Sequence, residues 1–292
     1  MRTEKILILL TLFILIFLGL LGVISFPKEE QAMKEGNISI TTAKNVSIVV
    51  VYDNNPYREG LKTAWGFSCL IKGTEKTILF DTGGDGLTLL ANMEKLGITP
   101  EEIDIIVLSH VHGDHVGGLS TLLKQNPKVT VYLLESFPKS FKDAVREYGA
   151  EVIQVKEELK ICDGVYSTGE LGTWIKEQSL VINTERGLIV ITGCAHPGIV
   201  KIVKVAKNLI ANDVNLVMGG FHLLGKSDEE ITQIISEFKK MGVRHVAPCH
   251  CSGERARQLF KKEYGENYFD VGVGRVITID SIDSINSINS AK

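Results

Sequence analysis

The sequence has little of what marks disordered, fibrous or nucleic-acid-binding chains. Only 7 of its 292 residues are prolines, and 44% are hydrophobic, which excludes a disordered or collagen-like chain. Charge of one sign is not in excess, because 32 lysines and arginines face 35 aspartates and glutamates, a net charge of −3. We therefore expect no nucleic-acid partner, since such proteins usually present a basic surface.

Cysteine is also scarce, and its five positions do not describe a disulfide framework. Their number is odd and their spacing is irregular, although one bridge could form if the domain faced an oxidising compartment. They stand at Cys69, Cys162, Cys194, Cys249 and Cys251.

Charge is absent altogether from residues 6–26, an apolar run of 21 residues. As a helix this run would measure about 31 Å, enough to cross a bilayer core, and it has no polar face that would suit a buried core helix. A cleaved signal peptide is the alternative, but the run is long and ends without a small-x-small cleavage site. We predict a retained single-pass anchor over residues 1–26. Arg2 and Lys5 precede it, so the domain is expected outside the cytoplasm.

The rest of the chain divides into a polar tether at residues 27–45, a folded domain at 46–280 and a low-complexity tail at 281–292. Strand and helix patterns alternate through two halves of the domain, which predicts an α/β fold of packed layers. Helices are expected at 87–96, 199–210, 228–241 and 254–264, with a short helical turn near 99–102. Strands are expected at 46–52, 67–71, 77–80, 103–108, 180–183, 188–192, 214–218, 243–247, 269–271 and 276–279.

Metal-binding side chains gather directly after the strand at 103–108. Residues 109–118 read SHVHGDHVGG, which places four such side chains within six residues. Zinc and similar ions take imidazole nitrogen and carboxylate oxygen at about 2.0–2.2 Å. A turn of this kind can direct two histidines to one ion and the following acid–histidine pair to a second, and we expect its glycines to let the backbone turn tightly. The four side chains are His110, His112, Asp114 and His115.

This motif is similar to the signature of the metallo-β-lactamase superfamily, and the likeness extends over residues 46–280. The resemblance implies a four-layer αββα sandwich. Asp81, in the segment LFDTG, resembles the early aspartate that braces the metal loop in that superfamily. Other segments resemble the branch named for 7,8-dihydropterin-6-methyl-4-(β-D-ribofuranosyl)aminobenzene-5′-phosphate synthase. They are VYDN at 51–54, WGFS at 65–68, TGCAHPGI at 192–199, GGFHL at 219–223 and PCHC at 248–251.

The chain departs from the superfamily pattern at two segments. A Gly-His-Thr segment usually supplies the third histidine of the first site, where residues 168–171 read TGEL. A Thr-Gly-Asp segment usually supplies a bridging aspartate, where residues 192–194 read TGC. We therefore predict His196 as the third ligand, with Cys194 and Glu170 as alternative ligands. Cys194 could instead be a small residue packed beneath the site, so one ion or two remain open.

The remaining histidines follow strands, except His245, which lies inside the strand expected at 243–247. His250 resembles the last histidine of the superfamily and is predicted to bind the second ion. His222 is expected on the substrate side, near the charge that develops in the reaction, although it could also bind metal or only end a strand. Asp53 and Asn54 either line the pocket or form a simple turn. His245 is expected to be structural.

Three functions follow from this site, with Zn²⁺ as the expected ion and Mn²⁺ or Fe²⁺ as alternatives. The first is a hydrolase whose metal-activated water, oriented by Asp114, attacks an ester, lactone or phosphodiester in a small-molecule substrate. The second is the synthase, a transferase, for which the branch is named. The third is a membrane-tethered protein that binds metal or ligand without catalysis. The anchor argues against the second, because pterin assembly uses cytoplasmic precursors, and the ligand set argues against the third. Oligomeric state is not predicted.

Overall fold

The computed structural model describes residues 38–282. The predicted anchor at residues 1–26, the first part of the tether and the tail beyond residue 282 lie outside the described residues. Within residues 38–282, no helix is long and apolar enough to cross a membrane.

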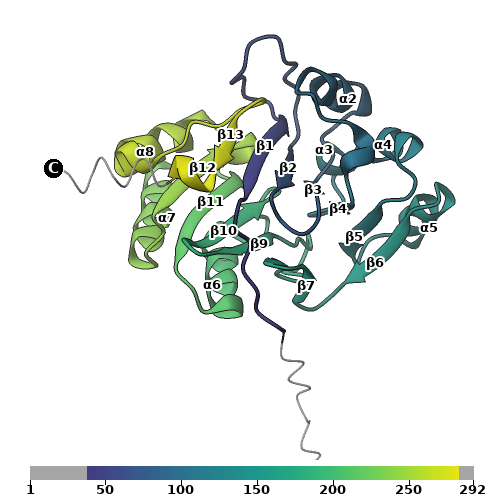
Figure 1. Cartoon of the computed structure of the whole chain (residues 1–292). Helices are drawn as coiled ribbons and strands as arrows, with labels where there is room; N and C mark the ends of the chain where they lie inside the picture. The colour runs from purple at the N-terminus through teal and green to yellow at the C-terminus, as the bar shows by residue number, and fades with distance from the viewer. Residues whose placement is uncertain (1–37, 283–292) are drawn as a thin grey trace, which may run out of the picture. The chain divides into compact units, whose positions relative to one another are not determined.

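The strands form two sheets, most of whose strands are labelled in Figure 1. The seven-stranded sheet has the order β13-β1-β2-β3-β4-β5-β6, and the six-stranded sheet has the order β12-β11-β10-β9-β8-β7. The first sheet consists of β1 (Ser47–Tyr52), β2 (Ser68–Lys72), β3 (Ile78–Phe80), β4 (Ile105–Val107), β5 (Thr130–Leu134), β6 (Glu151–Val155) and β13 (Val276–Thr278). The second consists of β7 (Leu159–Cys162), β8 (Val165–Ser167), β9 (Leu180–Thr184), β10 (Gly187–Thr192), β11 (Val214–Gly220) and β12 (His245–Cys249).

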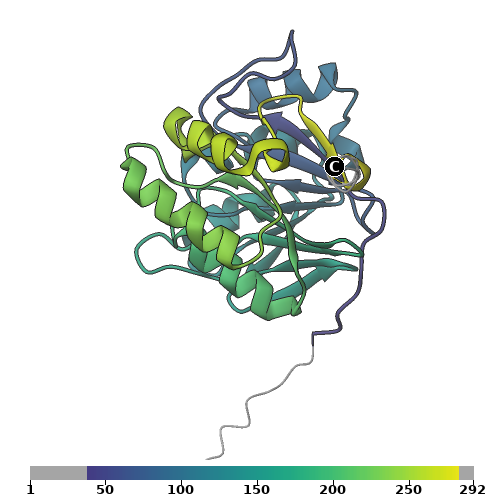
Figure 2. The same cartoon turned by 90° about the vertical axis from the view of Figure 1, so that its left-hand side faces the viewer.

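Helices cover the sheets. The first half contributes α2 (Gly86–Lys95), η1 (Pro100–Glu102), α3 (Gly113–Val116), α4 (Leu119–Gln125) and α5 (Lys139–Glu147). The second half contributes α6 (Ile199–Ile210), α7 (Asp228–Lys240), η2 (His250–Ser252), α8 (Glu254–Tyr264) and η3 (Gly265–Asn267). Figure 2 shows α6, α7 and α8, in green to yellow, side by side along one face.

Side chains along the central strands of the six-stranded sheet alternate between two separate hydrophobic cores. On β10, Ile189 and Ile191 belong to the core shared with the seven-stranded sheet, while Leu188 and Val190 belong to the core beneath α6, α7 and α8. Successive side chains of a strand point to opposite faces, so a strand buried on both faces becomes apolar throughout. The predicted two-sheet α/β sandwich is thereby confirmed.

All but one of the predicted helices and strands are present. Helices α6 and α8 have the predicted bounds, and the predicted turn near residue 99 is the 3-10 helix η1. Ser227 caps α7 in a complete capping box with Glu230. The strand predicted at residues 269–271 is wrong, because this segment forms no ladder. Phe269 donates one backbone hydrogen bond to Val246, and isolated bridges flank it on either side.

Both ends of the described chain pack onto the domain. The Thr41 backbone N–H donates to the Tyr166 hydroxyl at 2.6 Å, and Ala43 forms an isolated bridge with Thr184. Ile282, in the segment predicted as tail, is fully buried in the core. Residues 41–43, which were predicted as part of the tether, thus contact β8 and β9.

The strand directions determine where reactive side chains can meet. Strands β3 and β4 run parallel, and β10, β11 and β12 run parallel to one another. Side chains that directly follow parallel neighbours emerge at the same edge of a sheet, which is where open α/β sheets place their sites.

Candidate metal centre

The first group of donors consists of three histidines. Nitrogen atoms of His110, His112 and His196 lie within 4.8 Å of one another. His110 and His112 follow β4, and His196 follows β10, so the group joins the two sheets. His110 Nε2 lies 3.1 Å from His112 Nδ1. The Nε2 atom of His196 is buried without a hydrogen-bond partner in the described structure, as a nitrogen that serves a metal ion would be.

The second group combines a carboxylate, two imidazoles and a thiol. One donor atom each from Asp114, His115, Cys194 and His250 lies within 4.8 Å of the others. Asp114 Oδ2 is 3.3 Å from His250 Nε2 and 3.6 Å from His115 Nε2, and His115 Nε2 is 3.2 Å from Cys194 Sγ. This mixed set suits zinc, which accepts nitrogen, sulfur and oxygen in one site.

A third group, which was not foreseen, lies against the second. Donor atoms of Cys194, His222 and Cys251 also lie within 4.8 Å of one another. His222 follows β11, and its ring centroid is 4.4 Å from that of His196. Cys251 belongs to η2, directly after His250.

Asp81 lies outside all three groups and fixes the residues that form them. Its carboxylate accepts hydrogen bonds from the Ser109 backbone N–H and hydroxyl, both at 2.7 Å, and it lies 2.7 Å from His115 Nδ1. Ser109 Oγ is in turn 2.9 Å from His110 Nδ1. A partner on Nδ1 leaves Nε2 free to face an ion and holds the ring in one orientation. Gly193 permits this network, because a Cβ there would meet Ser109 Oγ at 2.2 Å.

Two further polar residues fix the loops after β12 and β10. Asn54 Oδ1 lies 2.9 Å from His250 Nδ1, and its amide donates to the His250 carbonyl, so Asn54 orients that ring. Glu177 is buried, and its carboxylate accepts four consecutive backbone N–H groups, from Gly193 to His196, at 2.8–3.1 Å. The loop that carries Cys194 and His196 is therefore wrapped around one carboxylate. Sequence reasoning missed Glu177, because its partners are backbone groups that leave no motif.

Residues with a left-handed backbone conformation cluster at the site. Among the described residues, only five non-glycine residues have positive φ, and four of them are Asp81, Ala195, His222 and His250, with φ between 45° and 61°. Each follows a strand of the sheets closely, where the chain must turn sharply. Such conformations cost on the order of 1–3 kcal/mol each, and they cluster at functional sites.

Burial and neighbouring charges shift the pKa values of these groups. Burial alone would lower the pKa of His115, but the Asp81 carboxylate outweighs it and raises that pKa. Burial, together with the other imidazoles, holds the pKa of His110 well below its usual range. Burial, followed by the nearby His222 and His112, lowers the pKa of His196 to about 4. Neutral His110 and His196 rings have lone pairs available for a metal ion.

The carboxyl and thiol groups also shift. Burial would raise the pKa of Asp114, but hydrogen bonding and charge from His250 and His115 hold it well below its usual range. Burial raises the pKa of Glu177 to about 7, against the opposing effect of its backbone donors. The Cys194 thiol, acting as a donor, lowers the pKa of Cys251. The site thus favours an anionic Asp114 and one thiolate in the cysteine pair.

Three expectations need correction or comment. Glu170, an alternative ligand, belongs to none of the groups, because its segment bonds to Lys156 and its carboxylate accepts the Ser136 backbone N–H at 2.7 Å. His245 is buried, with Nδ1 3.0 Å from the Asn215 carbonyl, away from the three groups. The glycines of the motif were expected to let the backbone turn tightly, and none of them has a positive φ. Gly117 and Gly118 instead allow close approach, since a Cβ on either would meet a backbone carbonyl oxygen at 2.1–2.2 Å.

Small cavities and two exposed tryptophans border the groups. A cavity of about 320 Å³ is lined by His196, Trp174 and Lys201, and one of about 140 Å³ by His112, Trp174 and Lys176, among others. Trp174 is 99% exposed. On another side, the half-exposed Trp65 ring lies 5.0 Å from that of His250.

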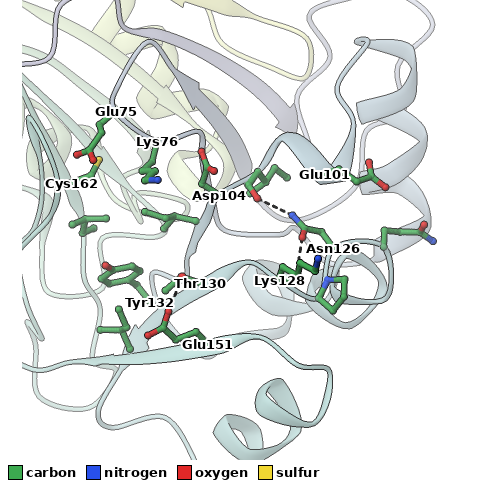
Figure 3. A pocket seen from close by; sticks show the side chains of 16 residues that line it. Glu75, Lys76, Glu101, Asp104, Asn126, Lys128, Thr130, Tyr132, Glu151 and Cys162 are labelled. Atoms are coloured by element: carbon green, nitrogen blue, oxygen red, sulfur yellow. Dashed lines mark hydrogen bonds between the residues drawn. The ribbon is translucent and has the colours of Figure 1, made fainter.

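A further cavity lies elsewhere in the described structure. It measures about 740 Å³ and is lined by residues where β4, β5 and β6 begin, including Asp104, Thr130 and Glu151 (Figure 3). It contains none of the predicted site residues, which follow the opposite ends of their strands.

Comparison with known proteins identifies the family. The family model for the metallo-β-lactamase superfamily matches residues 66–208. A crystal structure described as Tm1679, a metal-dependent hydrolase of the β-lactamase superfamily, is 31% identical and superposes with a TM-score of 0.68. The match covers 80% of this chain and 98% of that structure. The chain belongs to the metallo-β-lactamase superfamily. The resemblance predicted from its motifs is therefore confirmed.

Two other matches refine this picture. The 7,8-dihydropterin-6-methyl-4-(β-D-ribofuranosyl)-aminobenzene-5′-phosphate synthase of Methanocaldococcus jannaschii is 29% identical over 82% of this chain and 99% of its own length. The metallo-β-lactamase fold protein YhfI of Bacillus subtilis, 15% identical with a TM-score of 0.60, shares the fold. The similarity to the synthase thus extends over nearly the whole domain.

Proposed function

We propose that the first two donor groups hold a pair of zinc ions. Three imidazoles would bind one ion, and Asp114, His115, His250 and Cys194 would bind the other. The thiol and imidazoles favour zinc over Mn²⁺ or Fe²⁺, because soft sulfur ligands select such ions. When bound, the ions would stabilise negative charge that develops on a substrate oxygen.

We propose further that the protein is an enzyme that joins a dihydropterin to an aminobenzene phosphate, the two parts of the product for which its synthase relative is named. The observation that carries this proposal is 29% sequence identity that extends over 99% of that relative's length. In such a reaction, an aminobenzene nitrogen would replace pyrophosphate on the methylene carbon of a dihydropterin. The C–O bond to pyrophosphate would break, a C–N bond would form, and the nitrogen would lose a proton.

The surroundings of the metal groups suit these substrates. Trp174 and Trp65 offer exposed indole faces on two sides, and flat heterocycles stack on such faces. Lys176 and Lys201 line the cavities beside His112 and His196, where their ammonium groups would attract phosphate. Asp114, whose side chain is 22% exposed, is the carboxylate of the second group and would orient the attacking nitrogen.

Hydrolysis is the second candidate, because the 31% identical structure is described as a metal-dependent hydrolase. Water would then take the place of the amine, on a phosphate ester, an ester or a lactone. The two reactions use the same electrostatic support and differ in the nucleophile admitted.

Product analysis of the zinc-loaded full chain separates the candidates. The protein would be supplied with dihydropterin pyrophosphate, with and without ribofuranosylaminobenzene phosphate, and pyrophosphate and the pterin product would be measured. The proposal expects the coupled product and amine-dependent release of pyrophosphate. Release of pyrophosphate without the amine, or turnover of a phosphodiester or lactone alone, would establish the hydrolase. No turnover of any substrate by a metal-loaded chain would favour a binding protein.

Metal analysis tests the site independently of the substrate. His110→Ala and His112→Ala should each reduce the bound zinc, because each removes one of three ligands from the first group. Lys124→Ala, on α4, is the matched control and should leave the metal content unchanged. Equal zinc content in all four proteins would overturn the assignment.

A further inference from the structure

We propose that Cys194, His222 and Cys251 form a third metal site, for one further zinc ion beside the pair. The donor atoms of these three residues lie within 4.8 Å of one another, as they do in each of the other two groups. Only Cys194 is shared with the second group. His222 and Cys251 belong to neither of the first two groups, so they have no metal-binding role in the proposed pair.

Three adjacent parallel strands bring the residues together. Cys194 follows β10, His222 follows β11, and Cys251 lies in η2 after β12. Cys251 Sγ is 3.6 Å from the Cys194 carbonyl oxygen, which holds the second thiol against the first loop. Gly220 makes this approach possible, because a Cβ there would meet Cys251 Sγ at 2.7 Å.

The donor set determines which ion would fit. Two thiolates and one imidazole with a fourth position open is a recognised zinc arrangement, and hard cations such as Mg²⁺ or Ca²⁺ require oxygen ligands. Cys251 and the shared Cys194 supply negative charge to a divalent ion in a place where both sulfurs are buried. The exposed His222 ring leaves the fourth position on the open side.

Sharing Cys194 is compatible with both sites. A thiolate sulfur has enough lone pairs to contact two ions at once, in the way a carboxylate does in two-metal centres. The proposal therefore places His222 on the metal, the option that the sequence left open beside a role with the substrate. It does not depend on which reaction the enzyme performs.

The metal content of the full chain, loaded with Zn²⁺ under reducing conditions and desalted, tests this site. The wild-type protein should retain three ions, and Cys251→Ala and His222→Gln should each retain two. Cys162→Ala, which removes a cysteine that lines the distant cavity, is the matched control and should retain three. His222 is exposed, so His222→Gln is expected to fold even if Cys251→Ala does not.

Cobalt provides a second readout. In the Co²⁺-loaded protein, Cys251→Ala should reduce the sulfur-to-cobalt absorption about threefold, from three cobalt–sulfur contacts to one. Two ions in the wild-type protein, with the same content in both variants and an unchanged cobalt spectrum, would overturn the third site. Loss of ions in His110→Ala but not in Cys251→Ala would leave the metal pair standing and remove only this inference.

Discussion

Replacing Glu177 by glutamine should weaken the loop that brings Cys194 and His196 to the site. In the native structure, one carboxylate oxygen accepts the N–H groups of Gly193, Cys194 and Ala195, and the other accepts that of His196. Glu177→Gln keeps the size of the side chain. Its amide nitrogen, however, would face the N–H of His196, so that two donors oppose each other.

The expected magnitude follows from counting these bonds. Above its pKa of about 7, Glu177 is ionised. A hydrogen bond to a charged group contributes about 1.5–3 kcal/mol, and a buried donor left without an acceptor costs about 1–3 kcal/mol. Glu177→Gln loses one such bond outright and weakens the other three, so we expect a loss of about 2–4 kcal/mol in the free energy of unfolding. Glu177→Ala would lose all four, about 6 kcal/mol or more, which approaches the total stability of many domains. The glutamine variant is therefore the informative one.

Urea denaturation and zinc titration of the full chain would measure both effects. Because Glu177 supports the residues that bind metal, zinc affinity should fall about 10–100-fold in Glu177→Gln. Glu185→Gln, at the exposed turn between β9 and β10, is the matched control and should stay within about 0.5 kcal/mol of wild type. Unfolding free energy and zinc affinity equal to wild type in Glu177→Gln would refute the reasoning.

Three further predictions concern stability and substrate binding. Ala211 ends α6 with φ of 52°, so Ala211→Gly should raise the free energy of unfolding by about 1 kcal/mol in urea denaturation. Ser227→Ala removes the capping box of α7 and should lower that free energy by about 1 kcal/mol in the same assay. Trp174→Ala should raise KM for the proposed pterin substrate about tenfold through lost stacking, without a change in melting temperature, and Trp174→Phe should recover part of the loss.

Each of these has a contrary outcome. Asn208→Gly, within the last turns of α6, should not stabilise the protein, and equal gains in both glycine variants would contradict the left-handed explanation. A Ser227→Ala protein as stable as wild type would show that the cap is not needed. Unchanged kinetics in Trp174→Ala would place the substrate away from the exposed loop.

The fold was predictable where one element carries its own pattern. Helix α6 shows apolar residues at helical spacing along its whole length, and its bounds match because such a pattern needs no tertiary context. No helix or strand was predicted between residues 109 and 179, where the structure has α3 to α5 and β5 to β8. The edge strand β6 is mostly exposed or half-buried and presents no clear alternation, but β5 is mostly buried and was missed as well. Residues 269–271 look like a strand by composition, but the ladder partners that make a strand depend on distant segments.

The same distinction between local patterns and distant contacts applies to the residues of the site. His110, His112, Asp114 and His115 were found because their donors are local in sequence. His196 was chosen through family resemblance, and the structure places it beside His110 and His112. Cys251 stands two residues after Cys249, a spacing too short for a routine zinc motif, so its approach to Cys194 appears only when β10 and β12 are placed in one sheet.

The left-handed residues of the site have a consequence for how this protein can change. Three of the four, Asp81, His222 and His250, carry chemistry that glycine cannot replace, and only Ala195 can relax without losing a functional side chain. At about 1–3 kcal/mol each, they represent a sizeable share of a typical folding free energy. Replacing these residues would stabilise the fold and destroy the metal site. Selection for thermal stability without selection for activity should therefore produce stable, inactive variants.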